Sequence, residues 1–413
     1  MEADSYHQCS TLIPMNGPQK IFLSAGEASG EHYGTLLIAA LRKLVPDADF
    51  FGLGGRRMEA LGFRPIVRSE DVAVMGITEV VRHMPRIYGE YRRLRASIAR
   101  EKPDIAILID FPDVNLSLAR HLKRQNVPVI YFVSPQLWAW KKYRIRSVQR
   151  YVDQMLVIFP FEERFYDDHG VAAEFVGHPL AELEPPRITR EDFARQTGID
   201  ASKLWVGLLP GSRGKEIRLN LPEIVRAAGI LGQQYEILLP LAPTLTASQR
   251  DHIRTLLGQL VAAQAQPPRI TLVDDARAVL HHARASIVAS GTATVEAALI
   301  GNPFVVVYRV SPLSYAVAKR VVDVPHVAMV NLVAGKRIVP ELIQGDFTAE
   351  KVVSQLRPLL DQDEARAQMR ASLRQVAVML RAEQSAIGRV AAITCQMLEQ
   401  QRAERRSPVP TGG

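Results

Sequence analysis

The sequence is poor in cysteine and has no long apolar run. Its 413 residues include two cysteines, Cys9 and Cys395, near opposite ends of the chain and without a CxxC spacing. A disulfide framework and a thiolate metal site are therefore unsupported, and a reducing cytosol fits best. No apolar run approaches the ~20 residues that a membrane-spanning helix requires. Residues 1–19 lack the basic start and the apolar stretch of a signal peptide, so we expect a flexible leader and no secretion.

Composition and charge narrow the choice of partners. Hydrophobic residues make up 47% and charged residues 23% of the chain, which is typical of globular proteins and excludes wholesale disorder. The 51 Lys and Arg residues outnumber the 43 Asp and Glu residues and give a net charge of +8. This excess favours anionic partners, which include phosphorylated metabolites, an acidic membrane surface and nucleic acid. The charge alone does not choose among them.

Short apolar runs alternate with helical patterns along most of the chain. Such alternation is typical of parallel sheets built from βαβ units, and nearly continuous apolar runs indicate strands buried between two layers of helices. The sequence therefore predicts an α/β fold with two doubly wound, Rossmann-like domains facing a cleft. The predicted strands are residues 20–24, 49–53, 104–110, 128–134 and 154–159, then 204–210, 235–240, 269–273, 285–290 and 304–308.

A proline-rich segment sets the expected domain boundaries. Residues 178–203 hold Pro179, Pro185 and Pro186 without apolar periodicity, which indicates a linker. We expect the ligand in the cleft beside it. The expected units are a leader at 1–19, an N-terminal domain at 20–182, a C-terminal domain at 204–345, helices at 346–402 and a frayed tail at 403–413. Whether the helices of 346–402 cross back to the N-terminal domain stays open.

Strand-to-helix turns are the places where an open α/β sheet binds ligands, because helix N-termini there present free N–H groups. The first such turn, SAGEASGEHYG, has glycines at 26, 30 and 34. It is not GxGxxG and no Walker lysine follows, which weakens nicotinamide and P-loop interpretations. The turn either faces a ligand or serves only the close packing of helix on strand.

Two later turns carry more specific side chains. In LLPGSRGKEI, Gly211 lets the backbone turn, and Ser212 and Arg213 open a helix. Cations at a helix start oppose the dipole, so we favour anion binding over a solvated basic turn. In SGTATVEAAL, Glu296 lies on the first turns of a helix. Its carboxylate either accepts hydrogen bonds from sugar hydroxyls or complements the helix dipole.

Nine motifs in register resemble one known family. The motifs are SAGEASGE, FGLGGRRME, MGITEV, SPQLWAW, FPFEERFY, VGHPL, LPGSRGKEI, SGTATVEAAL and NLVAGKRIVPELIQ. In order and spacing they are similar to the lipid A disaccharide synthases, glycosyltransferases of Gram-negative outer-membrane biosynthesis with a GT-B fold. The resemblance spans about residues 20–344 and is more specific than any one motif.

The resemblance implies an inverting transfer that joins UDP-2,3-diacylglucosamine to 2,3-diacylglucosamine 1-phosphate and releases UDP. The product is lipid A disaccharide 1-phosphate. Such a transfer needs a base, positive charge for the departing UDP and a cleft that excludes water. We expect no cofactor and no metal, because a GT-B cleft uses helix termini and basic side chains in place of a cation. The Asp-x-Asp spacings at 47–49 and 361–363 follow no buried strand directly.

On the acceptor side, Asp110 is the candidate catalytic base. It ends a buried strand, where partial desolvation would give its carboxylate the raised pKa that a base requires. Similarity of DFPDVN to the family's DAPDFN segment favours this role over capping of the helix that starts near Asp113. His32 is an alternative base. The resemblance also places Glu27, Ser29 and Glu79 at acceptor or cleft positions.

On the donor side, the resemblance assigns residues to the UDP-sugar. The diphosphate turns are Gly211, Ser212 and Arg213 with Thr292 and Thr294, the ribose contact is Glu296, and Asn331 lies on the nucleotide side of the cleft. Two positions depart from the family pattern. Glu31 stands where members usually have Asp, and Val330 stands where they usually have Pro.

Both implied substrates carry acyl chains, so we expect a peripheral protein on the cytoplasmic face of the inner membrane, with a homodimer left open. Ile87, Tyr91, Leu94 and Ile98 form a helical stripe, with Arg86, Arg92, Arg93 and Arg100 largely opposite. The periodicity favours a helix docked on the sheet, its arginines free for lipid phosphates. A second candidate for membrane contact is the group Trp138, Trp140, Lys141 and Lys142. Either these residues anchor the protein at the membrane interface, or the two tryptophans simply pack in the core.

Two other functions compete with this interpretation. A UDP-sugar epimerase on the same architecture would use the same diphosphate turns without an acyl surface. A nucleic-acid-binding module is suggested only by the net charge. Against it, the basic residues are scattered along the chain and no recognition motif occurs. We therefore expect no nucleic acid partner.

Overall fold

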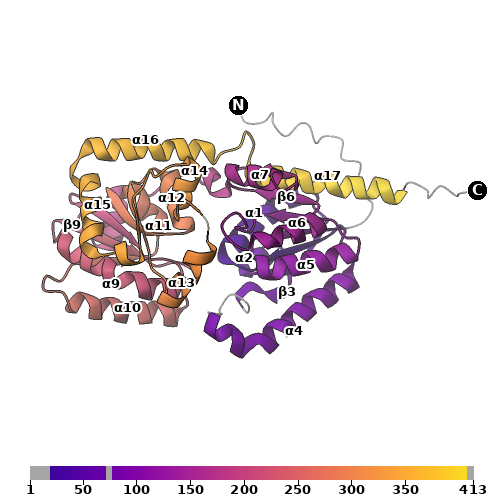
Figure 1. Ribbon diagram of the computed structural model, residues 1–413, viewed down its shortest axis with the longest axis horizontal. Helices are drawn as coiled ribbons and strands as arrows, with labels where there is room; N and C mark the ends of the chain where they lie inside the picture. The colour runs from indigo at the N-terminus through magenta and orange to yellow at the C-terminus, as the bar shows by residue number, and fades with distance from the viewer. Residues whose placement is uncertain (1–18, 71–76, 323, 407–413) are drawn as a thin grey trace, which may run out of the picture.

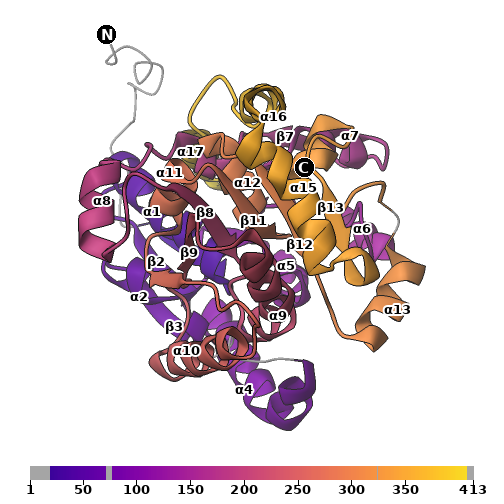
Figure 2. The same cartoon turned by 90° about the vertical axis from the view of Figure 1, so that its left-hand side faces the viewer.

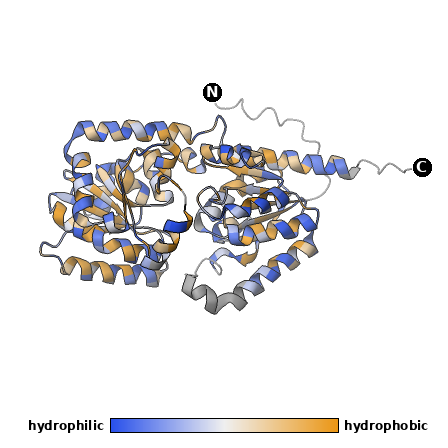
Figure 3. Ribbon diagram, viewed as in Figure 1, coloured by the Kyte–Doolittle hydropathy of each residue, from blue (hydrophilic) through white to orange (hydrophobic). Residues whose placement is uncertain are grey.

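The computed structural model describes residues 19–70, 77–322 and 324–406, and these form two lobes. Each lobe has a parallel β-sheet at its centre and helices on both faces (Figure 1). Hydrophobic residues are concentrated in the strands and on the helix faces that cover them (Figure 3). The fold is therefore the expected pair of doubly wound domains.

The sheet of the N-terminal lobe has the strand order β3-β2-β1-β4-β5-β6-β7. Its central strand β4 is buried along its whole length, as a strand covered on both faces must be. The strands are β1 (Lys20–Ala25), β2 (Asp49–Gly54), β3 (Arg64–Arg68), β4 (Ile105–Ile109), β5 (Val129–Phe132), β6 (Gln154–Val157) and β7 (Ala173–Phe175). The helices are α1 (Ala28–Leu44), α2 (Arg56–Glu59), α4 (Ile77–Glu101), α5 (Pro112–Arg124), α6 (Ile145–Tyr151) and α7 (Pro160–Asp167), with a 3-10 turn η2 (Lys142–Arg144).

The sheet of the C-terminal lobe has the order β10-β9-β8-β11-β12-β13. Figure 2 looks onto this lobe, with α9 and α10 on one side of the sheet and α11 and α12 on the other. The strands are β8 (Leu204–Leu209), β9 (Tyr235–Pro240), β10 (Ile270–Val273), β11 (Ala285–Ala289), β12 (Phe304–Tyr308) and β13 (Glu341–Ile343). The helices are α8 (Arg190–Thr197), α9 (Gly214–Leu231), α10 (Ala247–Ala262), α11 (Ala276–His282), α12 (Thr292–Ile300), α13 (Pro312–Val321), α14 (Met329–Ala334) and α15 (Ala349–Asp361), with a 3-10 turn η4 (Gln344–Asp346).

The last two helices lie on different lobes (Figure 1). Helix α16 (Asp363–Met379) packs against α12, whereas α17 (Ala386–Arg406) packs against α1. The segment between them touches the linker and its 3-10 turn η3 (Pro179–Glu182). The amide of His178 donates to the Leu380 carbonyl at 2.8 Å, and the Ser385 hydroxyl donates to the Glu182 carboxylate at 2.7 Å. Two crossings of the chain between the lobes therefore lie side by side.

All ten predicted strands are present, and three further strands were not predicted. The missed strands β3, β7 and β13 are the outer or short strands of their sheets, and their residues are mostly half-buried. A strand covered on fewer sides needs no continuous apolar run, so it leaves a weaker pattern. Residues 1–18 of the expected leader, with Cys9, and residues 407–413 of the expected tail lie outside the described part of the chain.

Helix α4 carries the predicted apolar stripe. Leu94 and Ile98 are buried and Tyr91 packs against the same core, while Arg92 and Arg93 are exposed. The docked-helix interpretation is thus confirmed for these residues. The side chains of Arg86 and Ile87 lie outside the described residues. Within the described ranges, no helix combines the length and the apolar character that crossing a bilayer would need.

Candidate active site

The strand order of each sheet reverses at one place, and the predicted turns lie there. In the N-terminal lobe, β1 has β2 on one side and β4 on the other; in the C-terminal lobe, β8 lies between β9 and β11. At such switch points neighbouring helices leave in opposite directions and open a crevice beyond the carboxyl ends of the strands. The Glu27 and Asp110 turns follow β1 and β4, and the Ser212 and Thr292 turns follow β8 and β11.

The Asp110 turn has an unusual backbone. Asp110 and Phe111 both adopt positive φ angles, 48° and 49°, which non-glycine residues rarely do. The Asp110 carbonyl accepts hydrogen bonds from the Tyr131 hydroxyl and from the Asn115 side-chain amide, both at 2.7 Å. Buried Asn115 also accepts a hydrogen bond from the Ser24 hydroxyl at 2.6 Å, which ties the ends of β1 and β4 together. These buried partners hold the turn in its strained conformation.

The carboxyl group of Asp110 has a strongly shifted pKa. Burial and, to a smaller extent, the negative charge of Glu27 raise the pKa to about 7, while the Phe111 amide and Arg213 oppose the shift. The N-cap of α5 is Phe111, so the helix does not require the Asp110 carboxylate as its cap. The raised pKa is the one expected from the sequence. A carboxylate in this state can accept a proton near neutral pH.

The turn after β1 packs directly against the Asp110 turn. A Cβ atom on Gly26 would come within 2.3 Å of the Phe111 ring, so only glycine fits there. Glu27 is the N-cap of α1, and Ser29 is half-buried in the first turn of that helix. Glu31 turns away, because its carboxylate accepts the Arg57 amide at 3.1 Å at the start of α2. Of the two glutamates, Glu31 therefore contacts α2, whereas Glu27 contacts Arg213 of the other lobe.

The remaining predicted acceptor-side residues have separate positions. Burial lowers the pKa of His32, and the charges of Arg57 and Arg277 add to the effect. Glu79 belongs to α4, but its side chain lies outside the described residues.

The turn after β8 presents an anion-binding geometry that carboxylates occupy. Gly211 has a φ of +127°, and a Cβ atom there would meet the Glu216 side chain at 2.9 Å. The amide of Ser212 donates to the Glu216 carboxylate at 3.3 Å, and the Arg213 guanidinium donates to it at 3.2 Å. Free N–H groups and a guanidinium at a helix start form a site for an anion.

An ion pair joins the turns of the two lobes. The Arg213 guanidinium donates to the Glu27 carboxylate at 2.9 Å. These residues are 186 positions apart in the sequence. The switch point of the N-terminal sheet therefore faces that of the C-terminal sheet across a gap that one ion pair spans.

The predicted residues of the turn after β11 differ in exposure. Thr292 is exposed at the start of α12, whereas Thr294 is buried and its hydroxyl donates to the Gly291 carbonyl at 2.7 Å. Glu296 pairs with Arg277 at 3.5 Å. Burial raises the pKa of Glu296, and Arg277 counteracts this.

Arg277 and Asn115 were not predicted. Arg277 follows the Asp275 N-cap of α11, after β10, in another turn at the same edge of the sheet. Besides Glu296, its guanidinium reaches the Glu184 carbonyl of the linker at 2.8 Å. Inspection of every strand-to-helix turn would have found Arg277, whereas nothing in the sequence marks Asn115 as the residue that ties β1 to β4.

Asn331 is placed differently from the expectation of a residue that faces the nucleotide. Its side chain is fully buried in α14. The amide nitrogen donates to the Val339 carbonyl at 3.0 Å and to the Glu341 carboxylate at 2.7 Å, and the oxygen accepts the Ile338 and Val339 amides. All of these hydrogen bonds therefore go to the segment that leads into β13 and to β13 itself.

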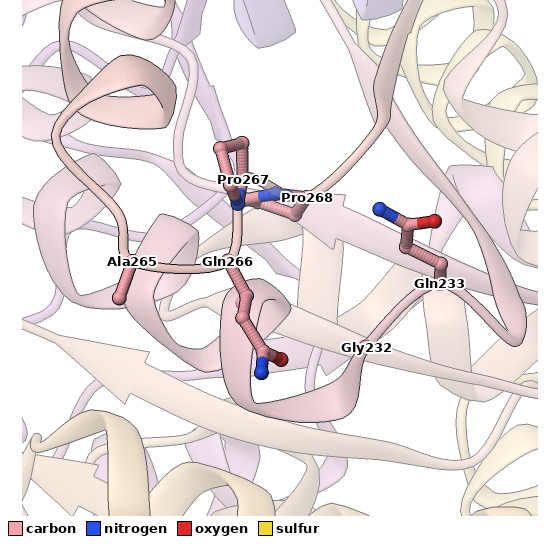
Figure 4. Close-up of a pocket in the computed structure, with 7 residues that line it drawn as sticks. Gly232, Gln233, Ala265, Gln266, Pro267 and Pro268 are labelled. Atoms are coloured by element: carbon pink, nitrogen blue, oxygen red, sulfur yellow. The ribbon is translucent and has the colours of Figure 1, made fainter.

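Other concave or acidic places do not belong to this crevice. A hollow of about 310 Å³ lined by Gly232, Gln233 and Pro268 lies beside the amino ends of β9 and β10, at the edge of the sheet opposite to the Ser212 and Thr292 turns (Figure 4). Asp49 pairs with Arg64 and Asp363 with Arg284, which uses both Asp-x-Asp segments in surface ion pairs. Nowhere in the described residues do three His, Cys, Asp or Glu side chains converge as metal ligands would.

Comparison with known sequences identifies close relatives. A sequence model described as lipid-A-disaccharide synthetase matches residues 21–394. The lipid-A-disaccharide synthase of Acidobacterium capsulatum is 67% identical over 398 residues, covering 95% of this chain and 100% of that protein. Those of Koribacter versatilis and Solibacter usitatus are 53% and 41% identical and cover 86% and 92% of this chain, and 92% and 98% of their own lengths.

Solved structures share the architecture at low sequence identity. The glycosyltransferase of kitacinnamycin superposes with a TM-score of 0.59 at 13% identity, covering 93% of this chain and 100% of its own. A UDP-GlcNAc 2-epimerase from Neisseria meningitidis, solved with UDP-GlcNAc bound, gives 0.52 at 13% identity with the same coverage. At this identity the likeness shows the fold alone, which is GT-B.

Proposed function

The chain belongs to the lipid-A-disaccharide synthase family of glycosyltransferases, and from this premise we propose the substrates and the roles of the site residues. The donor is UDP-2,3-diacylglucosamine and the acceptor is 2,3-diacylglucosamine 1-phosphate. The products are lipid A disaccharide 1-phosphate and UDP. The observation that carries the proposal is the pairing of Glu27 with Arg213, which brings an acidic switch point to face an anion-binding one.

On the donor side, the diphosphate takes the places that carboxylates hold in the free protein. Phosphate oxygens replace Glu216 at the Ser212 amide, and they replace Glu27 and Glu216 at the Arg213 guanidinium. Thr292 adds an exposed N-terminal turn for the second phosphate group. Glu296 accepts hydrogen bonds from the ribose, with Arg277 orienting its carboxylate.

On the acceptor side, Asp110 removes the proton of the attacking hydroxyl group. The hydroxyl oxygen forms a bond to the anomeric carbon from the face opposite to UDP, so the bond to the phosphate oxygen breaks with inversion. The proton passes to Asp110. Arg213 and the helix N-termini stabilise the negative charge that develops on the departing UDP. Burial and the charge of Glu27 raise the pKa of Asp110 to about 7, which supports this role.

Asn331 positions the site instead of contacting the nucleotide. Its contacts to the chain before β13 and to Glu341 support this role. Glu27 and Ser29 line the acceptor side, and Glu79 keeps the role implied by its motif. Because both substrates carry acyl chains, the enzyme works at the cytoplasmic face of the inner membrane without crossing it, and the exposed arginines of α4 meet lipid phosphates.

The test supplies both acylated sugars to the purified protein in detergent micelles. We expect disaccharide and UDP in equal amounts, measured by mass spectrometry and by a coupled assay for UDP. Omission of either sugar should abolish product. A protein that converts UDP-N-acetylglucosamine alone into its 2-epimer, and makes no disaccharide, would instead be the epimerase that the shared fold allows.

A further inference from the structure

A second group of cations lies beside Asp110, and neither the donor site nor the proposed chemistry uses it. It lies in the loop that joins β5 to α6. Residues 133–152, which comprise this loop and α6, contain five Lys and Arg residues and no Asp or Glu. Since β5 is the neighbour of β4, this loop leaves the sheet next to the Asp110 turn.

Two of these cations converge on one carboxylate. The Lys141 ammonium lies 3.5 Å from the Asp113 carboxylate, and the Arg144 guanidinium donates a hydrogen bond to the same group. Asp113 belongs to the first turn of α5, where the helix dipole also favours an anion. The Asp113 side chain is 67% exposed, against 29% for Lys141 and 18% for Arg144. The side chains of the two cations are therefore more buried than the carboxylate that they bind.

The loop is rigid beneath these cations. The indole N–H of Trp138 donates to the buried Glu162 carboxylate at 3.1 Å, and its ring packs edge-on against Phe161. Trp138 is thus packed in the core, whereas Trp140 is 40% exposed and carries the Lys141 ammonium 4.2 Å from its ring centre. Lys141 has a φ of 54°, a strained conformation that such surroundings impose. The Lys141 ammonium therefore contacts both the Trp140 ring and the Asp113 carboxylate.

Tyr131 connects this group to the base. Its hydroxyl donates to the Asp110 carbonyl at 2.7 Å. Burial raises the pKa of that hydroxyl, and the charges of Asp110, Arg144 and Asp113 all act on it as well. Arg144 and Asp113 therefore lie near the side chain that holds the backbone of the Asp110 turn.

We propose that Lys141 and Arg144, with the first turn of α5, bind the phosphate group of the acceptor sugar in exchange for Asp113. The inference rests on the proposed function, because it assigns this phosphate to an acceptor that Asp110 deprotonates. A phosphomonoester carries −1.5 to −2 charges near neutral pH and has three accepting oxygens. The Asp113 side chain is largely exposed, so water screens its ion pairs and a phosphate group can displace it.

The charges in the cleft favour such a site. The acceptor phosphate must approach Asp110 and Glu27, which are both acidic, and the UDP diphosphate, which occupies Arg213. Without cations of its own it would be repelled by each of them. Lys141 and Arg144 supply those cations on the side of Asp110 that belongs to β5.

The test measures equilibrium binding of the phosphorylated acceptor and of its unphosphorylated counterpart in neutral micelles, without donor. The wild-type protein should prefer the phosphorylated sugar by about tenfold or more. Lys141→Ala with Arg144→Ala should abolish this preference, and Asp113→Asn should increase it. Arg150→Ala, which removes an exposed cation from the end of α6, is the matched control and should leave it unchanged.

Turnover and vesicle binding separate the remaining outcomes. The double variant should raise the KM for the acceptor about tenfold and leave the KM for the donor unchanged. A double variant that keeps its preference for the phosphorylated sugar overturns the proposal. Equal weakening for both sugars, with lost binding to phosphatidylglycerol vesicles, overturns it in favour of a bilayer headgroup. A wild-type protein that shows the preference but makes no disaccharide supports this site and contradicts the proposed function.

Discussion

The two lobes share a topology and differ in the chemistry of their switch points. In each sheet, the first strand of the lobe lies between its second strand and a later one, and helices leave from both turns. The N-terminal lobe places Glu27 after β1 and Asp110 after β4. The C-terminal lobe places Ser212 and Arg213 after β8 and Thr292 after β11. One lobe therefore presents carboxylates where the other presents hydroxyl groups, amides and a guanidinium.

The same backbone arrangement thus carries acidic side chains in one lobe and a basic side chain in the other. A helix N-terminus carries partial positive charge, so an acidic side chain such as Glu27 is compatible with it, whereas Arg213 at the start of α9 needs an anion nearby. In the free protein Glu27 and Glu216 supply that anion. In the proposed function, phosphate oxygens take the place of these carboxylates at Arg213. The following substitutions test this difference between the lobes.

The largest effect is expected from Asp110→Asn, which removes the proton acceptor and keeps its shape. Turnover should fall by about 10²- to 10⁴-fold, the usual contribution of a positioned base. The Kd of UDP should stay within about twofold, because the turns proposed to bind the diphosphate belong to the other lobe. Steady-state rates and calorimetric UDP titration measure the two effects. The control is Asp47→Asn, at the amino end of β2 and the opposite edge of the same sheet. Near-normal turnover in Asp110→Asn would remove the base assignment.

A smaller effect is expected from Arg213→Ala, which changes the other lobe. Loss of a charge-assisted hydrogen bond of about 1.5 to 3 kcal/mol should weaken UDP binding by about 10- to 100-fold. The pH at which rate falls should also rise, since Arg213 opposes the upward shift in the pKa of Asp110. Arg218→Ala, an exposed cation further along α9, serves as the control in the same titration. Equal UDP affinity in both variants would place the diphosphate elsewhere.

The sequence predicted the central strands and most of the turns, for a physical reason. Buried parallel strands must be apolar along their length, so β4 and β11 are visible as runs, whereas the edge strands β3, β7 and β13 are not. Motifs located Asp110 and Arg213, because a turn at the end of such a strand has a fixed place in the sheet. Contacts between residues far apart in the sequence, such as Glu27 with Arg213, could not be predicted from either motif alone.

Side-chain direction was the least predictable feature of the site. Thr292 and Thr294 lie in one motif, yet the first is exposed and the second is buried against Gly291. Asn331 has a polar side chain in a motif of the C-terminal lobe, yet its hydrogen bonds serve its own loop. Whether a polar group faces a ligand or satisfies nearby backbone depends on the whole packing around it.

Glu27→Gln tests how the acidic lobe adjusts its own base. Glu27 raises the pKa of Asp110 by repulsion between like charges. Its neutralisation should lower that pKa and move the acid limb of kcat/KM toward lower pH by about one pH unit. Wild-type kcat/KM should fall as pH drops through about 7, because the base must be ionised. A pH–rate profile of both proteins measures the shift, and Glu182→Gln, a carboxylate at the chain crossing, is the control. An unmoved limb would show that Glu27 does not act on the base.

The smallest effect concerns stability and has the opposite sign to the effect on rate. The folded protein raises the pKa of Asp110 to about 7, from about 3.9 in an unfolded chain. The folded state therefore binds the proton more tightly, and its contribution to stability is full below about pH 3.9 and is lost as pH rises to about 7. Asp110→Asn removes this loss, so its Tm should exceed that of the wild type by about 2–4 °C at pH 8. The excess should shrink toward pH 4, and differential scanning calorimetry at both pH values measures it.

A Tm difference independent of pH would mean that Asp110 is not buried as a charge. A gain in stability with the loss of turnover would instead show that the N-terminal lobe keeps an unfavourable carboxylate for its function.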